Sequence, residues 1–315
     1  MKILVLTLFS LPVLATVLDL FLGDPSRLPH PVRLIGRFLD WLEVHARQWV
    51  LGLKASGALC VVLTAGSAWV VVEFLTGLHY LGMLASLYFA YAGLALGELL
   101  DEGRDALELM EEGNLDEARE IVGGLVTRDT SSMDEPELRK TLAETLSENL
   151  CDGYVAPLFY LVLGGPALMW AYKAVSTMDS MWGYRTERFR DLGWAAAKAD
   201  DILAWIPARL TALLLLGAGA IMRLPWREAA RHIPAEARTM DSPNAGWPMS
   251  ACAWLLEGSM GGAAVYFGEA KMKPELGPKG MEWSIEKLTR IFRLMVFAAF
   301  LGILVLQGLK VAATL

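Results

Sequence analysis

Three carboxylates at a four-residue spacing are the most chemically suggestive feature of this 315-residue sequence. Glu144, Glu148 and Asp152 would share one face of a helix, where like charges repel one another. A solvated acidic surface tolerates that repulsion, and so does a magnesium site in which carboxylate and phosphate oxygens surround the ion. The spacing leaves both interpretations open. Thr145 and Asn149 form a second polar pair alongside the carboxylates.

A second group mixes basic and polar residues after a long apolar run. It begins at Lys173, continues through residues 177–188 and ends at Arg209. Lys and Arg beside a membrane commonly orient a protein or contact lipid headgroups. Asp179, Ser180 and neighbouring Tyr and Glu residues are interspersed among these cations. This mixture favours specific recognition of phosphate.

A third group surrounds Asp19, near the end of the first apolar run. A carboxylate in that position is costly in a membrane and needs a partner. Arg33 or Arg37 would serve. A structural ion pair and a ligand-binding role are equally compatible with this arrangement.

Several familiar sites are missing from the sequence. It has no Gly-x-Gly-x-x-Gly and no Gly-x-x-x-x-Gly-Lys phosphate loop, so a nucleotide would have to bind in another way. The four histidines form no zinc-binding spacing. Three widely spaced cysteines imply no disulfide framework.

The elements that must position these residues are membrane helices. Hydrophobic residues make up 55% of the chain, with a mean hydropathy of +0.40. Crossing the hydrocarbon core takes about 20 helical residues, and several nearly uncharged runs approach that length. They are residues 3–23, 55–72, 74–97, 155–172 and 294–309. We therefore expect an all-α polytopic membrane protein with about 4–6 transmembrane helices, plus re-entrant or interfacial helices.

Charge is distributed unevenly along the chain. Residues 98–152 contain 17 acidic and 5 basic residues, whereas the remainder has 18 acidic and 23 basic residues. This pattern argues against a nucleic-acid partner, which requires a basic face. Arginines in residues 23–48, and none at the 73–77 hairpin tip, place the first loop and the acidic segment in the cytoplasm by the positive-inside rule.

Within this frame we expect the first run to be a retained helix over about residues 2–22, rather than a cleaved signal peptide. The acidic segment, residues 98–153, has a helical apolar rhythm that breaks at Gly113, and Asn114 and Glu117 have capping-box spacing. Pro136 fits the first turn of a further helix. Gly164-Gly165-Pro166 predicts a break in the 155–172 run, and residues 202–222 are expected to be irregular. Residues 223–290 form a long polar segment within what we expect to be a single domain over 1–315.

Six ordered motifs make the sequence resemble the CobD/CbiB family along nearly its whole length. They are LDLFLGDPSRLPHPVRLIGR (18–37), RDTSSMDEPE (128–137), ETLSENLCDGYVAPLFY (144–160), YKAVSTMDSMWGYRTERF (172–189), IPARLTALLL (206–215) and MDSPNAGWPMSA (240–251). Ser176 is a departure, because members of the family usually have Asn at that position. The substitution keeps a small polar group.

The resemblance implies an inner-membrane ligase of cobalamin biosynthesis with a cytoplasmic active site. It would use ATP and Mg²⁺ to join adenosylcobyric acid to (R)-1-amino-2-propanol O-phosphate, giving adenosylcobinamide phosphate. Its partners would be these corrinoid and amino-alcohol substrates, the lipid bilayer and other late cobalamin-assembly enzymes.

The chemistry needs metal ligands, cations around phosphate and a group that takes an ammonium proton. Candidate magnesium ligands are Asp129, Asp134, Glu144, Glu148 and Asp152. Candidate catalytic groups are Asp179, Tyr184, Glu144 and Glu148. Candidate substrate or phosphate binders are Arg33, Arg128, Asn149, Lys173, Ser180, Arg185, Arg188, Arg209 and Asn244.

Two other functions remain open. A transporter would use intramembrane charges and broken helices, but the strongest motifs here lie in polar segments. A non-catalytic scaffold or sensor of the same family would be expected to lose the carboxylates and arginines that this chain keeps.

Overall fold

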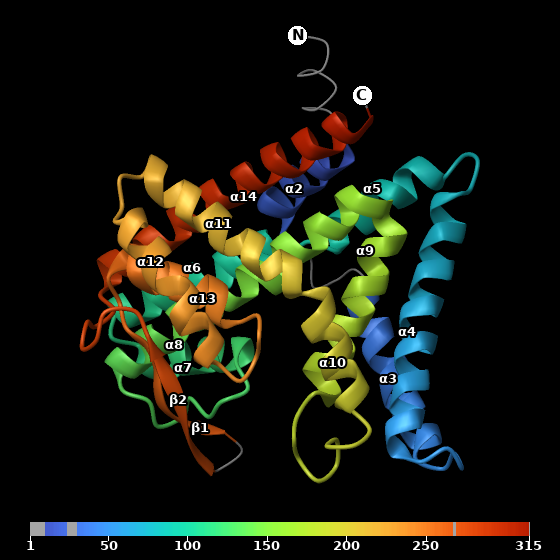
Figure 1. Cartoon of the computed structure of the whole chain (residues 1–315), viewed down its shortest axis with the longest axis horizontal. Coiled ribbons are helices and arrows are strands. Elements are labelled where there is room, and N and C mark those ends of the chain that lie inside the picture. The colour runs from blue at the N-terminus through green and yellow to red at the C-terminus, as the bar shows by residue number, and fades with distance from the viewer. Residues whose placement is uncertain (1–9, 24–29, 267–268, 315) are drawn as a thin grey trace. The chain divides into compact units, whose positions relative to one another are not determined.

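The computed structural model describes residues 10–23, 30–266 and 269–314, and it is almost entirely helical (Figure 1). Side chains are described outside residues 264–271 and 314. The chain divides into two compact units, each assembled from separate segments: residues 1–95, 156–204 and 306–315 in unit 1, and residues 96–155 and 205–305 in unit 2. That the whole chain is one domain stays a prediction.

Unit 1 contains six described helices and the end of a seventh, all drawn in Figure 1. Helix α4 packs against α3, α9 and α10, and α2 packs against α5. Because Gly57 has no side chain, α4 can approach the Leu192 backbone closely. A Cβ added at Gly57 would lie 2.0 Å from the Leu192 carbonyl oxygen. The helices are α2 (Leu11–Leu22), α3 (Pro31–Ala46), α4 (Leu53–Thr76), α5 (Gly82–Ala92), α9 (Ala156–Trp182) and α10 (Trp194–Leu203).

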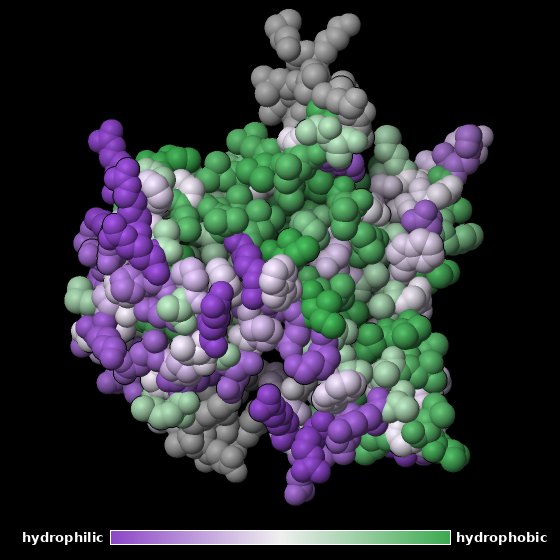
Figure 2. Space-filling model, in the orientation of Figure 1, coloured by the Kyte–Doolittle hydropathy of each residue, from purple (hydrophilic) through white to green (hydrophobic). Residues whose placement is uncertain are grey.

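The core of unit 1 joins four of these helices. Leu39 of α3, Cys60 of α4, Met178 and Trp182 of α9, and Ala196 of α10 are all buried in one cluster. Helix α3 accounts for most of the polar segment 23–48, and its first turn begins with Pro31. Apolar side chains also lie along the outer edge formed by α4, while hydrophilic ones gather at the loop between α9 and α10 (Figure 2).

Unit 2 holds the acidic segment and the polar segment 223–290. Helix α13 packs against α8, α11 and α12, and α8 also contacts α6, α7 and η1. Its elements are α6 (Leu96–Glu111), α7 (Leu115–Leu125), α8 (Glu135–Asn149), the π-helix η1 (Leu150–Val155), α11 (Trp205–Ile221), α12 (Trp226–Glu236), the 3-10 turn η2 (Ala237–Thr239), α13 (Gly246–Leu256), β1 (Met260–Tyr266), β2 (Glu269–Leu276) and most of α14 (Ile285–Thr314).

Strands β1 and β2 are an addition to the predicted all-α fold. They pair antiparallel from Met260 opposite Leu276 to Tyr266 opposite Glu269, with an irregularity between Met260 and Gly262. The hairpin is the red-orange ribbon at the lower left of Figure 1. Apolar residues of the otherwise polar segment 223–290 are divided between α13 and β1.

Four helical segments within the described ranges are long and apolar enough to cross a membrane, or five if the bent α10–α11 pair is one span. The four are Leu53–Thr76, Gly82–Glu111, Glu135–Trp182 and Ile285–Ala313. This confirms the polytopic helical class. Helix α2 is a shorter apolar helix, and the expected helical residues 2–9 lie outside the described residues.

The predicted interruptions are confirmed. In α9, Gly164 (φ −144°, ψ 22°) and Gly165 (φ 75°, ψ −172°) leave helical geometry immediately before Pro166. Helices α10 and α11 meet at a bend of 44°. The stop at Gly113 also appears as expected, whereas the hairpin tip lies at residues 77–81, after the end of α4, and not at the predicted 73–77. Which side of the membrane each segment faces stays a prediction.

One capping prediction is wrong in its position. Asn114 makes no side-chain cap hydrogen bond at the start of α7. The capping box lies at the next helix, where the Asp134 side chain accepts from the Glu137 N–H at 2.9 Å and Glu137 accepts from the Asp134 N–H at 3.3 Å. Both Asn114 and Asp134 have an acid three residues later, so spacing alone cannot distinguish them.

Candidate functional site

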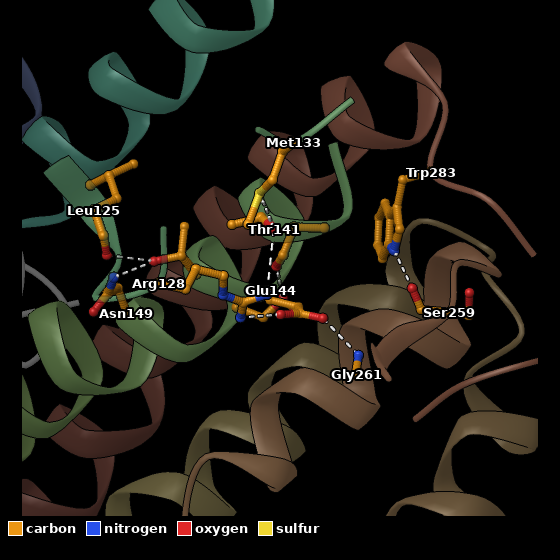
Figure 3. A network of polar contacts seen from close by, with 12 residues as sticks. Leu125, Arg128, Met133, Thr141, Glu144, Asn149, Ser259, Gly261 and Trp283 are labelled. Carbon is orange, nitrogen blue, oxygen red and sulfur yellow. Dashed lines mark hydrogen bonds and ion pairs between the residues drawn. The ribbon is translucent and has the colours of Figure 1, made fainter. Parts of the chain in front are cut away.

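The centre of the candidate site in unit 2 is a buried ion pair between Arg128 and Glu144 (Figure 3). The arginine precedes α8, and the glutamate lies in the middle of that helix. Their side chains are 8% and 1% exposed. The second Glu144 oxygen accepts a hydrogen bond from the Gly261 N–H at 2.6 Å. The carboxylate therefore links the loop before α8 to the base of the β-hairpin.

Hydroxyl and amide groups surround this pair. The Arg128 guanidinium also donates to the Thr141 hydroxyl at 3.4 Å. One helical turn further along, Thr145 donates to the Leu125 carbonyl at 3.0 Å and accepts from the Asn149 amide at 2.9 Å. The predicted Thr145–Asn149 pair thus exists (Figure 3), and it fixes the end of α7 against α8.

Glu148 differs from Glu144 although both lie on α8. It is partly exposed and makes no side-chain hydrogen bond with any other described residue. It is close enough to Arg128, Glu144 and Lys273 of β2 to interact with each electrostatically. A carboxylate beside cations, with no hydrogen-bond donor from the described chain, is suited to receive a cationic or hydrogen-bonding group of a ligand.

The hairpin supplies cations that the sequence analysis missed. Lys273 lies on β2 opposite Gly262, and the Lys140 ammonium lies 3.9 Å from where a Cβ of Gly262 would be. Lys140 belongs to α8. Only the fold brings Lys273 to Glu148 and the Gly262 backbone to Lys140, because nothing in the spacing indicates that residues 260–276 return to α8.

The five predicted magnesium ligands do not form a cage. Asp134 caps α8, Glu144 is held by Arg128 and Gly261, and Asp129 accepts from the Ser131 hydroxyl at 2.6 Å and its N–H at 2.9 Å. Hydrogen bonds from Ser131 hold the Asp129 pKa below its usual range. Within the described ranges no three His, Cys, Asp or Glu side chains are arranged to hold a metal ion.

The geometry between Glu148 and Asp152 also differs from the expected α-helix. Residues Leu150–Val155 form the π-helix η1, so the four-residue spacing does not place Asp152 directly above Glu148. The residues thus fit no protein-built magnesium site.

Arg209 and Asn244 meet, but within the protein's own network. The guanidinium lies between the rings of Trp205 and Trp247, 4.2 Å and 4.7 Å from their centroids. It donates to Asn244 Oδ1 at 3.0 Å and to the Pro243 carbonyl at 3.2 Å. These contacts hold the 240–247 motif against α11, and phosphate binding by Arg209 stays a prediction.

A partly buried carboxylate in unit 2, Glu236, was missed by the sequence analysis. It accepts from the Ser250 hydroxyl at 2.7 Å, the Trp254 indole at 2.9 Å and the Gly277 N–H at 2.9 Å. Glu236 ends α12, and its partners belong to α13 and to the residue after β2. It secures the end of β2 at the base of the hairpin.

In unit 1 the predicted phosphate binder Arg188 is part of an ion-pair cluster. It donates twice to Glu43 of α3, at 2.8 Å and 2.7 Å, and Arg47 donates twice to Glu43 Oε1. Hydrogen bonding from Arg188, with a further contribution from Arg47, lowers the Glu43 pKa, and the same contact raises the Arg188 pKa. Neither Glu43 nor Arg47 was predicted.

The other predicted residues of unit 1 lie on α3, α9 and the following loop. Arg33 and Arg185 are exposed, and Lys173, Asp179 and Tyr184 are partly buried. Ser180 donates to the Ser176 carbonyl at 2.9 Å, a contact that needs no particular side chain at 176. Asp19 is buried in α2. Its predicted pairing with Arg33 or Arg37 stays a prediction.

Comparisons with known proteins identify the family. Residues 12–295 match the family model described as CobD/Cbib protein. The chain belongs to the CobD/CbiB family. It is 41% identical over 268 residues to Cobalamin biosynthesis protein CobD of Geobacter metallireducens, covering 84% of each chain. It is 35% identical over 304 residues to the CobD of Photorhabdus laumondii, covering 94% of this chain and 95% of that protein.

A third CobD/CbiB relative is Cobalamin biosynthesis protein CbiB of Salmonella choleraesuis, 36% identical over 306 residues, covering 92% of this chain and 93% of that protein. No solved structure matches the chain. Membership of the CobD/CbiB family supports a role in cobalamin biosynthesis.

Proposed function

We propose that the chain is an ATP-dependent ligase of cobalamin biosynthesis. It joins adenosylcobyric acid to (R)-1-amino-2-propanol O-phosphate, or a related amino alcohol, through an amide bond and releases adenosylcobinamide phosphate. The observation that carries this proposal is the family match over residues 12–295. The proximity of Glu148 and Lys273, beside the ion pair of Arg128 and Glu144, supports it, because an amino-alcohol phosphate carries one positive and one negative group that such residues bind.

The proposed chemistry has two steps. An oxygen of the corrinoid carboxylate attacks the γ-phosphorus of ATP, the bond from that phosphorus to the β-phosphate oxygen breaks, and ADP leaves. The amine of the amino alcohol then attacks the acyl carbon, and phosphate leaves as the C–N bond forms. Magnesium accompanies ATP as part of the substrate, which is how this ion usually reaches phosphate-transfer sites.

The chain's residues bind, orient and take a proton. Lys140 and Lys273 supply positive charge for phosphate oxygens, which lysine binds as a point charge. Glu148 receives the ammonium group of the amino alcohol and accepts the proton that must leave before the amine attacks. Arg128 and Glu144 position the β-hairpin that carries Lys273. A proton-handling role for Asp179 or Tyr184, both in unit 1, stays a prediction.

The direct test is reconstitution. Purified protein in detergent receives adenosylcobyric acid, aminopropanol phosphate and MgATP, and mass spectrometry follows adenosylcobinamide phosphate and ADP. We expect equal amounts of both products in the complete reaction and neither product when ATP is omitted. When the amine is omitted, we expect no amide product and at most one equivalent of ADP per protein, from the first step. Glu112→Gln, an exposed acidic position on the same segment, serves as a matched control. Uptake of corrinoid into proteoliposomes, without formation of ADP or of amide product, would instead identify a transporter.

The proposed location is the cytoplasmic membrane, with the active site on the cytoplasmic face where ATP is available. Single cysteines at positions 137 and 190, in a background lacking Cys60, Cys151 and Cys252, report on this proposal. A membrane-impermeant maleimide applied to intact cells should label neither position. Labelling of position 190 alone would remove the residues after α9 from the proposed active site.

A further inference from the structure

A charged groove lies between α6 and the first half of α14, in unit 2 and apart from the site described above. Its volume is about 540 Å³. The polar residues that line it include Arg104, Glu108 and Glu111 of α6 and Arg293 of α14. Its apolar walls include Leu107, Phe292, Val296 and Phe297. No part of the proposed ligase chemistry uses this groove.

The groove coincides with a change in the exposed face of α14. Towards its N-terminus that face presents Thr289, Arg290 and Arg293, and beyond them it presents Phe297, Phe300 and Leu304, which are 43%, 54% and 61% exposed. Residues 285–313 are long and apolar enough to cross a membrane. Large apolar side chains exposed along such a helix face hydrocarbon, so the boundary between headgroups and acyl chains falls between Arg293 and Phe297.

The charges in the groove are poorly satisfied by the protein. Across the described ranges, Arg293, Glu108 and Glu111 form no side-chain hydrogen bond or ion pair. Arg104 forms an ion pair with Asp101, three residues away, where both side chains are more than half exposed, and its guanidinium lies 5.8 Å from the Phe292 ring centroid. An exposed pair of this kind is weak. The groove therefore offers two cations and two anions to a ligand.

These features specify the ligand chemistry. Two arginines suit a phosphate group, since guanidinium binds phosphate oxygens in a bidentate manner. Two glutamates beside them suit a primary ammonium, which has three N–H donors. An anionic headgroup without an ammonium would meet uncompensated repulsion from Glu108 and Glu111. The adjoining stripe of Phe297, Phe300 and Leu304 offers apolar surface to acyl chains.

We propose that the groove between α6 and α14 is a specific binding site for a phospholipid with a phosphoethanolamine headgroup. The phosphate binds Arg104 and Arg293, the ammonium binds Glu108 and Glu111, and an acyl chain follows Phe297 and Phe300. A lipid in this position fills the groove between α6 and α14 at the membrane boundary.

Delipidated protein in detergent tests the proposal by native mass spectrometry. Phosphatidylethanolamine, phosphatidylglycerol and phosphatidylcholine of identical acyl chains are titrated separately. We expect phosphatidylethanolamine to bind most tightly, because phosphatidylglycerol has no ammonium and phosphatidylcholine has no N–H donor. Loss of one charged hydrogen bond should weaken this binding by about tenfold in Arg293→Gln and Glu111→Gln. The controls Arg290→Gln and Glu112→Gln change neighbouring exposed charges outside the groove and should bind as wild type does.

The double variant Glu108→Gln/Glu111→Gln sharpens the test, because it should lose the preference for phosphatidylethanolamine over phosphatidylglycerol. Equal binding of all three lipids, or unchanged binding by Arg293→Gln, overturns the proposal. A final arm adds free phosphoethanolamine or aminopropanol phosphate as competitor. We expect little displacement at concentrations equal to the lipid's, since neither has acyl chains. Displacement at equal concentration would show that the groove binds a soluble amino-alcohol phosphate, and the lipid proposal would be wrong.

Discussion

Glu144 in unit 2 and Glu43 in unit 1 are both buried carboxylates that pair with arginine, yet their surroundings differ. Glu144 has one arginine, itself 8% exposed, and one backbone N–H. Glu43 has two arginines, Arg47 and Arg188, which are 32% and 67% exposed. The first pair is closed off from water and neutral, whereas the second keeps an excess positive charge open to solvent. Breaking a buried ion pair is costly, because the remaining charge has no access to water. Breaking an exposed pair costs little, because water solvates the remaining charge.

The largest expected effect comes from breaking the enclosed pair. Arg128→Met or Glu144→Ala leaves one buried charge without its partner, which costs about 3–5 kcal/mol of stability. Thermal unfolding in detergent, followed by light scattering or circular dichroism, measures the loss. The double variant Arg128→Met/Glu144→Leu should recover much of it, because no unpaired charge remains. If either single variant unfolds at the wild-type temperature, the pair is not enclosed as described.

The next largest expected effect is a loss of activity with no loss of stability. Glu148 lies one turn from Glu144 but makes no hydrogen bond with the described protein, so Glu148→Gln should preserve the unfolding temperature. Loss of the proposed proton acceptor should lower kcat by about 100-fold. Steady-state assays of amide product, alongside Glu112→Gln as control, measure the change. A wild-type rate would remove Glu148 from the proposed chemistry.

A smaller effect is expected from the exposed pair. Arg188→Ala leaves Glu43 with Arg47 and with access to water, so the loss of stability should be less than about a third of that of Arg128→Met. The same unfolding measurements compare the two directly. An equal loss in both variants would contradict the difference drawn between the two units.

The smallest effect is in pH dependence. The Glu43 pKa lies below its ordinary value of 4.5 because Arg188 and Arg47 favour the charged form. A carboxyl whose pKa is lowered on folding stabilises the protein fully above its unfolded pKa and loses this contribution as pH falls through the folded value. Wild-type stability should therefore decline below about pH 4.5 more steeply than that of Glu43→Gln. Parallel declines measured by thermal unfolding between pH 7 and pH 3 would show that Glu43 contributes nothing.

Much of the fold could be predicted because it depends on local patterns. Apolar runs gave the membrane helices, Gly164-Gly165-Pro166 gave the break in α9, and Pro136 gave the start of α8. The hairpin of β1 and β2 could not be predicted, since its strands are stabilised by packing on α8 and α13. Propensity alone rarely identifies a two-stranded ribbon that depends on such contacts.

The site divides in the same way. Spacing identified Glu144 and Glu148 but treated them as equivalent, and only the fold shows that Arg128 and Gly261 enclose one of them. It also suggested phosphate binding by Arg188 and Arg209, whose contacts prove to be with Glu43 and with Trp205, Trp247 and Asn244. An arginine donates the same hydrogen bonds to a phosphate ligand as to oxygen atoms of the protein. The sequence alone therefore cannot distinguish a ligand-binding arginine from a structural one.

The N–H that reaches Glu144 belongs to a residue that can carry no side chain. Gly261 has φ +83°, and a Cβ there would lie 2.1 Å from the Pro274 carbonyl oxygen. Gly262 also has a positive φ, but the nearest atom to its Cβ position is the flexible Lys140 ammonium, 3.9 Å away. In a saturation library, position 261 should thus accept glycine alone, while position 262 should retain some asparagine and aspartate, the residues that best tolerate left-handed backbone. The difference in tolerance between these two neighbouring positions would show that the Glu144 carboxylate depends on the backbone N–H of residue 261.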